Sequence, residues 1–232
     1  MIEDHSSCIR VSDVGTCNYC FSKNIIKNGT TKTGKQQYVC KSCKKRFIEF
    51  YSYKAYKRNI NSQIIQFTKE GLGIRSIARV LNISTTTLLK RIINIAGNIL
   101  EPKISFHQSY ELDEMRFFIG NKSNLMWLVY AINKNTKEIA GFYIGKRTNK
   151  TLNKIIKTLI NSKAEKIFTD KLMNYKYLIP ENIHSTKRYS TNSIERMNLT
   201  IRTHFKRFNR RTICFTKSIV VLNSLLKIYF WG

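Results

Sequence analysis

The spacing of apolar and polar positions changes twice along the chain. Residues 1–52 hold only short strand-like runs, such as 36–39, separated by turn residues. Residues 53–104 instead place apolar side chains at helical spacing, and residues 105–232 open with aromatic-rich strands before turning helical. The pattern predicts three domains with these boundaries.

The C-terminal region reads as a mixed α/β fold. Turn-rich connections between its first strands favour an antiparallel meander, and the alternation of later helices and strands favours a mixed sheet. The expected elements are strands at 110–119, 125–132 and 138–144, a helix at 151–160, a strand at 166–169, and helices at 191–205 and 216–229.

The middle region predicts three helices within residues 60–99. Gly71 is a plausible end of the first helix, and Ser84 is a plausible N-cap of the third. The second and third helices resemble a helix-turn-helix, whose recognition helix would face a DNA major groove. The residues that it would offer to DNA are Thr85, Thr86, Thr87, Lys90 and Arg91. A plain helical hairpin that packs on the next domain is the alternative.

Four cysteines form two CxxC pairs in the N-terminal region. The pairs are Cys17 with Cys20 and Cys40 with Cys43. Each pair directs two thiolates at one tetrahedral centre, and a segment this small needs such a staple, so we expect a zinc ribbon. Disulfides are less expected in a reducing cytosol, and a thioredoxin-like redox pair would need a βαβ surrounding.

The charge of the chain points to a partner. There are 41 Lys and Arg against 14 Asp and Glu, a formal net charge of +27. A compact protein this basic repels itself unless a polyanion neutralises it, and nucleic acid is the commonest such polyanion in cells. A solubilising or ribosome-like surface is the plainer alternative. The longest apolar run, residues 125–132, is too short for a membrane span, and the acidic N-terminus lacks a secretory signal, so we expect a cytoplasmic protein without a membrane partner.

Acidic residues are scarce, and three of them stand out. Asp113 lies within the first expected strand, Asp170 follows the strand at 166–169, and Glu195 is the only acid in residues 182–232. Strand alternation places Asp113 on one face and Glu114 on the other, so Glu114 is expected to be structural. Converging carboxylates suit Mg²⁺, and two such ions can drive phosphodiester displacement. Without metal, their repulsion should raise at least one pKa.

These residues sit in segments that resemble a known family. The segments are Glu111-Leu112-Asp113-Glu114, Phe168-Thr169-Asp170 and residues 189–199, followed by Arg202, His204 and residues 215–218. Through them the chain is similar to IS1 family transposases, which are DDE recombinases with an RNase H-like catalytic domain. The two parts that such transposases often encode in overlapping frames would form one continuous chain here.

The resemblance implies a function and assigns roles. Asp113, Asp170 and Glu195 would bind Mg²⁺ or Mn²⁺, and Arg202 would meet a DNA phosphate. The protein would bind the terminal inverted repeats of an insertion sequence, cleave the DNA and transfer the strand to target DNA, acting as a homo-oligomer on nucleoid DNA in a prokaryotic-type cell. Two alternatives stay open: a non-catalytic DNA-binding repressor or domesticated remnant, and a structure-selective RNase H-like nuclease.

Overall fold

The computed structural model describes residues 9–10, 15–48, 50–51, 53–57, 59–187 and 190–232. The chain divides into two compact units, one holding residues 1–64 and 74–89 and the other holding residues 65–73 and 90–232. The acidic N-terminus discussed above lies outside the described residues. Among the residues that are described, no helix combines the length and the apolar character that crossing a bilayer requires.

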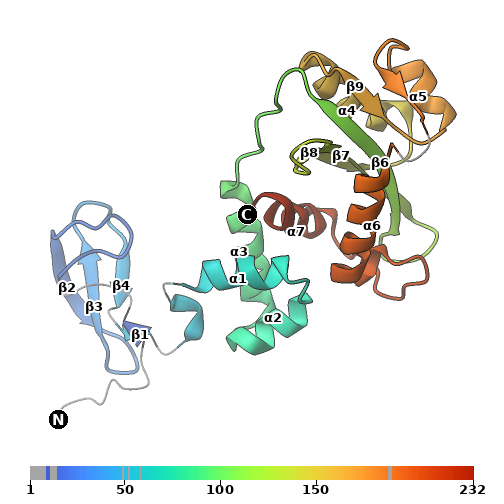
Figure 1. Cartoon of the computed structure of the whole chain (residues 1–232). Helices are drawn as coiled ribbons and strands as arrows, with labels where there is room; N and C mark the ends of the chain where they lie inside the picture. Colours follow the sequence, from blue (N-terminus) through green and yellow to red (C-terminus); the bar gives the residue numbers. More distant parts are fainter. Residues whose placement is uncertain (1–8, 11–14, 49, 52, 58, 188–189) are drawn as a thin grey trace. The chain divides into compact units, whose positions relative to one another are not determined.

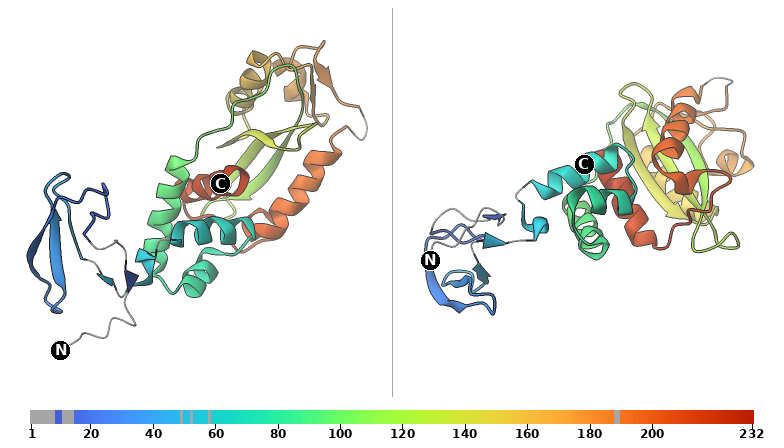
Figure 2. Two further views of the ribbon diagram at one scale, coloured as in Figure 1. Left: turned by 60° about the vertical axis from the view of Figure 1, so that its left-hand side comes forward. Right: turned by 90° about the horizontal axis from the view of Figure 1, so that it is seen from below.

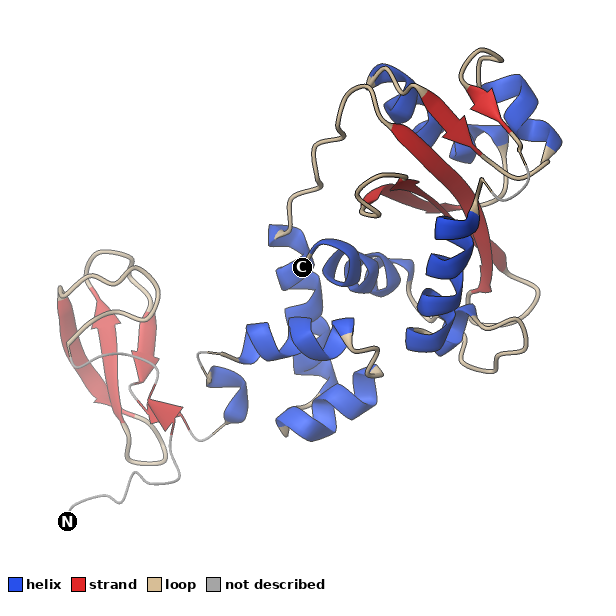
Figure 3. Cartoon of the chain, in the orientation of Figure 1, coloured by secondary structure: helices blue, strands red, loops and turns tan. Residues whose placement is uncertain are grey.

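The first unit begins with short strands joined by loops (Figure 3). A three-stranded antiparallel sheet is accompanied by one two-stranded pair, and its predicted strand at 36–39 is confirmed. Tyr38 faces Phe47 across the sheet, and their rings stack with centroids 5.7 Å apart. The strands are β1 (Ile9–Arg10), which pairs with β5 (Phe50–Tyr51), and β2 (Ile25–Thr30), β3 (Gln36–Cys40) and β4 (Arg46–Ile48).

Three α-helices follow, as predicted. After a 3-10 turn, η1 (Lys54–Tyr56), the helices are α1 (Ile60–Lys69), α2 (Ile74–Leu81) and α3 (Thr85–Asn98). Gly71 follows α1 with a φ of +75°, a conformation that glycine adopts without strain. The Ser84 hydroxyl accepts a hydrogen bond from the Thr87 backbone N–H at 3.1 Å, so the expected N-cap of α3 is present.

The second unit is built on a five-stranded mixed sheet in the order β10-β9-β6-β7-β8 (Figure 1). Strands β6, β7 and β8 form the predicted antiparallel meander, and β9 runs parallel to β6 and to β10. Their bounds are β6 (Ser109–Phe118), β7 (Leu125–Asn133), β8 (Ile139–Gly145), β9 (Lys166–Phe168) and β10 (His184–Ser185).

Helices cover the sheet on both faces. On one face, Leu112 and Val129 join a buried cluster with Leu152 and Ile156 of α4. On the other face, α6 packs on β6 and β7, and α7 packs on β8 (Figure 2). The helices are α4 (Asn149–Asn161), α5 (Met173–Leu178), α6 (Asn192–His204) and α7 (Ile219–Trp231), with a 3-10 turn, η2 (Lys206–Phe208), after α6.

The expected α/β class is confirmed, with local differences. The short elements α5 and β10 were not predicted, and α7 begins at Ile219 rather than at Thr216. Thr216 instead forms a parallel bridge with Ile119 and is fully buried, so it extends the sheet edge. Ser218 then caps the helix by accepting a hydrogen bond from the Val221 N–H.

Candidate active site

The register of the sheet brings two of the three singled-out acids together. Glu111 of β6 lies opposite Phe168 of the parallel strand β9. Asp113 and Asp170 each follow two residues further along their strands, so they arrive at the same level. Strand β9 ends at Phe168, and beyond it no described strand pairs with that side of β6. Carboxylates can therefore gather at this free edge.

Glu114 belongs to the same group of carboxylates, which the sequence did not predict. One oxygen from each of Asp113, Glu114 and Asp170 lies within 4.8 Å of the others. The alternation of faces itself is as expected, because Glu114 contacts Arg147 while Asp113 contacts α6. The expectation that Glu114 lies away from Asp113 was wrong, since an oxygen of each lies within 4.8 Å of the other although their partners differ.

Arg147 holds Glu114 in place. The Arg147 Nε lies 3.1 Å from Glu114 Oε1, and its guanidinium group lies over the Trp127 ring, 4.6 Å from the centroid. The Glu114 side chain is 1% exposed, and burial raises its pKa although Arg147 opposes the shift. Glu114 is thus a buried carboxylate that is paired with Arg147 at the edge of the acidic group.

Glu195 approaches the group from α6 but is not among the oxygens within 4.8 Å. It lies in the first turn of that helix, where its Oε1 accepts a hydrogen bond from the Thr191 hydroxyl at 3.0 Å. Burial raises the pKa of Asp113, and the charges of Asp170 and Glu195 raise it further, against hydrogen bonds from the Glu114 N–H and Asn198. One pKa in this group is therefore raised, as expected, but burial contributes more to the rise than the repulsion between the acids.

Two hydrogen bonds, one buried and one partly buried, tether α6 to β6. The Glu111 carboxylate, on a residue that is 1% exposed, accepts the backbone N–H of Ile194 at 2.9 Å. The Asn198 amide donates to Asp113 Oδ2 at 2.6 Å. The Tyr130 hydroxyl in turn donates to Asn198 Oδ1 at 2.7 Å. These contacts fix the helix that carries Glu195 against the strand that carries Asp113.

Arg202 lies further along α6, seven positions beyond Glu195. It is half-buried, and among the described residues its Nε has no hydrogen-bond partner. Burial raises the pKa of Tyr130 well above its usual range, with Asp113 raising it further, whereas the positive charge of Arg202 lowers it. Arg202 therefore places a cation on the same face of the sheet as Asp113. Tyr189, which starts the motif around Glu195, lies outside the described residues.

The four cysteines of the two CxxC pairs converge in the first unit. Their sulfur atoms all lie within 4.8 Å of one another, with Cys17 and Cys43 Sγ 3.6 Å apart and Cys20 and Cys40 Sγ 3.5 Å apart. The backbone N–H of Cys43 is the main cause that lowers the pKa of the Cys40 thiol to about 6. A sulfur-only set with N–H donors directed at it suits a tetrahedral zinc ion.

The predicted DNA-reading residues lie on α3. Thr85, Thr86 and Lys90 are exposed, whereas Thr87 and Arg91 are half-buried. The Thr87 hydroxyl accepts hydrogen bonds from Ser84 at 2.9 Å and from Tyr53 at 3.3 Å. Thr87 is thus partly engaged in the cap of the helix.

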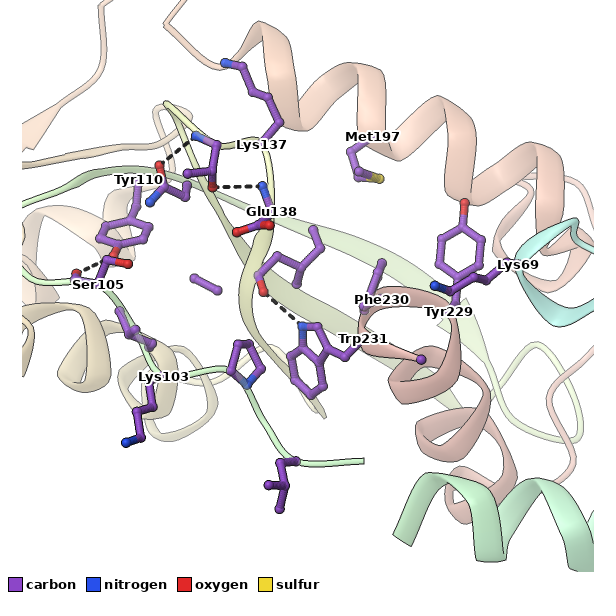
Figure 4. Close-up of a pocket in the computed structure, with 18 of the residues that line it drawn as sticks. Lys69, Lys103, Ser105, Tyr110, Lys137, Glu138, Met197, Tyr229, Phe230 and Trp231 are labelled. Atoms are coloured by element: carbon purple, nitrogen blue, oxygen red, sulfur yellow. Dashed lines mark hydrogen bonds between the residues drawn. The ribbon is translucent and has the colours of Figure 1, made fainter. Parts of the chain in front are cut away.

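A separate cavity of about 700 Å³ lies in the second unit. Figure 4 shows Lys69, Lys103 and Lys137 around it, together with aromatic side chains from the end of α7. The Trp231 indole donates to the Ile139 carbonyl at 3.0 Å. The three singled-out acids do not line this cavity, so it is distinct from the carboxylate group.

Comparison with known proteins decides the family. The IS1 transposase family model, DDE_Tnp_IS1, matches residues 108–230, which is more than half of the chain. The chain belongs to the IS1 transposase family. The matched segment contains all the carboxylates described above.

Similar proteins support the same family. The chain is 36% identical over 111 residues to the insertion element iso-IS1n protein InsB of Shigella dysenteriae, covering 48% of this chain and 85% of that protein. It is 29% identical over 119 residues to the IS1 protein InsB of Shigella flexneri, covering 51% and 91%.

Solved structures give a weaker likeness. A chain of the simian T-cell lymphotropic virus intasome in complex with PP2A regulatory subunit B56 gamma aligns with a TM-score of 0.37 and 15% identity, covering 70% of this chain and 66% of that one. The Drosophila P element transposase strand transfer complex aligns with a TM-score of 0.31 and 16% identity, covering 52% and 34%.

Proposed function

We propose that this IS1 family chain is an active transposase, which binds the terminal inverted repeats of its element and catalyses Mg²⁺-dependent DNA cleavage and strand transfer. The observation that carries the proposal is the meeting of Asp113 and Asp170 at the free edge of β6, with Glu195 brought toward them on α6. The strand order β10-β9-β6-β7-β8, with three antiparallel and two parallel strands, supports an RNase H-like sheet.

The roles of the acids follow from their chemistry. Asp113, Asp170 and Glu195 would hold the divalent cations, Mg²⁺ or Mn²⁺, and their oxygen ligands suit such hard ions. When bound, two such ions would activate the attacking oxygen and stabilise the leaving oxygen. Asn198 keeps the Asp113 carboxylate oriented, and Arg202 would receive a DNA phosphate. Water would first cut at the 3′ end of the element, and the freed 3′ hydroxyl would then attack target DNA.

The N-terminal part would bind the element ends. The four cysteines would hold zinc, and α3 would present Thr85, Thr86, Thr87, Lys90 and Arg91 to the major groove of double-stranded DNA. Because two ends must be cut together, we expect a homo-oligomer on DNA. A net charge of +27 supports this partner.

The test is a cleavage assay with the full-length chain. A supercoiled plasmid that carries the DNA flanking the coding region is incubated with the protein and Mg²⁺, and nicked and joined products are counted. We expect the wild type to nick and join, Asp113→Asn to bind without nicking, and Glu165→Gln, which changes an exposed acid on the loop before β9, to behave as wild type. Tight binding without nicking by the wild type would favour the repressor, and cleavage of branched DNA without end sequences would favour the nuclease.

A further inference from the structure

The loop between η2 and α7 combines cations and an exposed apolar side chain. This segment, residues 209–215, is called the arginine loop below. It contains Arg210 and Arg211, both exposed, followed by Ile213, which is 88% exposed. Beyond Glu195 the sequence contains no acidic residue, and among the described residues neither arginine forms an ion pair. The loop is thus cationic without internal neutralisation.

The loop is held firmly at both ends. Before it, Phe208 is 1% exposed and packs edge-on against Phe117 of β6, with ring centroids 5.4 Å apart. At its end, Phe215 packs edge-on against Phe118 at 6.2 Å. Thr216 then exchanges hydrogen bonds with β6 and with the turn after it, accepting from the Gly120 N–H at 2.9 Å. The residues between Phe208 and Phe215 are therefore held in position by contacts with β6 and the turn after it.

Ile213 is one of the most exposed large apolar side chains among the described residues. Burying an isoleucine side chain is favourable by about 1.5–3 kcal/mol, so a partner that covers Ile213 would gain from the contact. Thr212, directly before it, is 8% exposed, and its hydroxyl accepts the Cys214 N–H at 2.9 Å. Because Thr212 turns inward, the side chain of Ile213 is left outside, next to Arg211.

An exposed apolar side chain that closely follows two arginines matches the chemistry of one partner. Proteins that deform double-stranded DNA place Arg side chains at the minor groove and its phosphates and insert an apolar wedge between base pairs. A protein–protein contact would instead favour an interface core depleted in charge, with larger apolar area than one isoleucine. Charge complementarity with a polyanion therefore selects DNA as the occupant.

We propose that the arginine loop is a second DNA-binding surface of this chain, with Arg210 and Arg211 on the phosphates of double-stranded DNA and Ile213 inserted as a wedge that unstacks a base step. The proposal rests on the proposed function, since it assumes that the chain acts on DNA. It assigns to the sheet-bearing unit a role in bending DNA that is separate from the carboxylates.

The test separates charge from wedge with matched controls. R210Q/R211Q removes two loop cations, and K150Q/K157Q removes two exposed cations of α4, on the opposite face of the sheet. Ile213→Ser removes the wedge, and Leu100→Ser changes a side chain that is also 88% exposed. Each full-length variant is titrated onto a linear duplex carrying 2-aminopurine, at several salt concentrations, after its thermal unfolding has been compared with that of the wild type.

The expected results differ between the variants. R210Q/R211Q should lower the slope of log affinity against log salt by about 2, since each lost phosphate contact removes about 0.9. Ile213→Ser should keep the slope and abolish the rise in 2-aminopurine fluorescence that reports unstacking. Duplex DNA should also slow alkylation of the neighbouring exposed Cys214 in the unaltered chain, as read by peptide mass spectrometry.

Three outcomes would overturn the proposal. One is that the loop variants behave as their controls on DNA that the wild type still binds and cleaves, which would leave the proposed function intact. Another is that Ile213→Ser changes the oligomeric state in the absence of DNA, measured by sedimentation, which would make the arginine loop a contact between copies. The third is binding of single strands in preference to duplex by this loop. Failure of the wild type to bind or cleave any DNA would instead defeat the proposed function.

Discussion

The cysteine cluster and the carboxylate group are two ligand sites built in opposite ways. Residues 17–43 contain all four sulfur ligands, and one hairpin brings the two CxxC pairs together. The carboxylates come from β6, from the second residue after β9 and from α6, and the tether from Glu111 to Ile194 spans 83 residues. We expect the first site to depend on a bound metal for its own folding, whereas the second is carried by a sheet with an apolar core of its own.

Removing zinc should have the largest effect, and it should affect the two sites differently. The cysteine-bearing segment, residues 15–51, has a very small apolar cluster around Phe47, so metal binding, worth about 10–16 kcal/mol for structural zinc near neutral pH, would supply most of its stability. We expect a strong chelator to unfold residues 15–51 and leave the sheet unit folded, as read by circular dichroism and limited proteolysis.

The Cys214→Ser variant is the control for zinc removal, because Cys214 lies outside the cluster. It should bind one zinc ion per chain, like the wild type, whereas Cys40→Ser should bind none. An unchanged proteolysis pattern after chelation would show that the module folds without metal.

The same contrast explains which features the sequence reveals. Spacing alone predicts the cysteine ligands, and aromatic alternation predicts β6, β7 and β8 nearly to their ends. The sequence does not reveal α5, which has six residues, or β10, which has two, because such short elements show no clear periodicity.

The carboxylate group was predictable only in part. Asp113 and Asp170 stand out as acids on or after strands, but the approach of Glu114 depends on where β9 ends, which no local pattern reports. The tethers through Glu111 and Asn198 depend on the packing of α6, and their only sequence signal is polar residues on faces that must be buried.

Replacing Asn198 tests whether the tether orients the carboxylates. Asn198→Ala removes the donor to Asp113 and the acceptor of Tyr130, leaving buried polar groups unpaired, at a cost of about 1–3 kcal/mol in the free energy of unfolding. We expect cleavage to fall about 10–100-fold, the usual effect of losing a group that orients a metal ligand, and the Mg²⁺ concentration for half-maximal cleavage to rise.

The matched control is Asn161→Ala, at the exposed end of α4. DNA binding should be unchanged in both variants. If Asn198→Ala lowers stability but cleaves with the wild-type Mg²⁺ dependence, Asn198 only holds the fold together.

In the absence of divalent cations, the stability of the chain should depend on pH through the carboxylate group. The pKa of Asp113 and that of Glu114 are raised by burial, so the folded chain keeps protons that the unfolded chain has lost. Their stabilising effect is present below the unfolded pKa of about 4 and is lost as pH rises through the raised folded values, by at most about 1.4 kcal/mol per pH unit for each group.

Urea unfolding of the metal-free chain at a series of pH values measures this loss. Asp113→Asn should show a shallower decline than the wild type, and its stability near neutral pH should not be lower. Mg²⁺ should raise the stability of the wild type near neutral pH, because bound cations require ionised carboxylates. Equal pH profiles for the two chains would mean that Asp113 is already ionised at no cost.

The smallest expected effect on stability comes from removing the Tyr130 hydroxyl, which donates to Asn198. Tyr130→Phe removes the donor to Asn198 Oδ1 and to the Ile194 carbonyl, which should lower the free energy of unfolding by about 0.5–1.5 kcal/mol. Tyr177→Phe, at a residue that is 78% exposed, should cost nothing measurable. A double-mutant cycle with Asn198→Ala then decides how the tether works, because residues of one hydrogen-bond network do not contribute additively. A coupling near zero would mean that Tyr130 and Asn198 act separately, so that the carboxylate site depends on individual contacts rather than on a chain of linked hydrogen bonds.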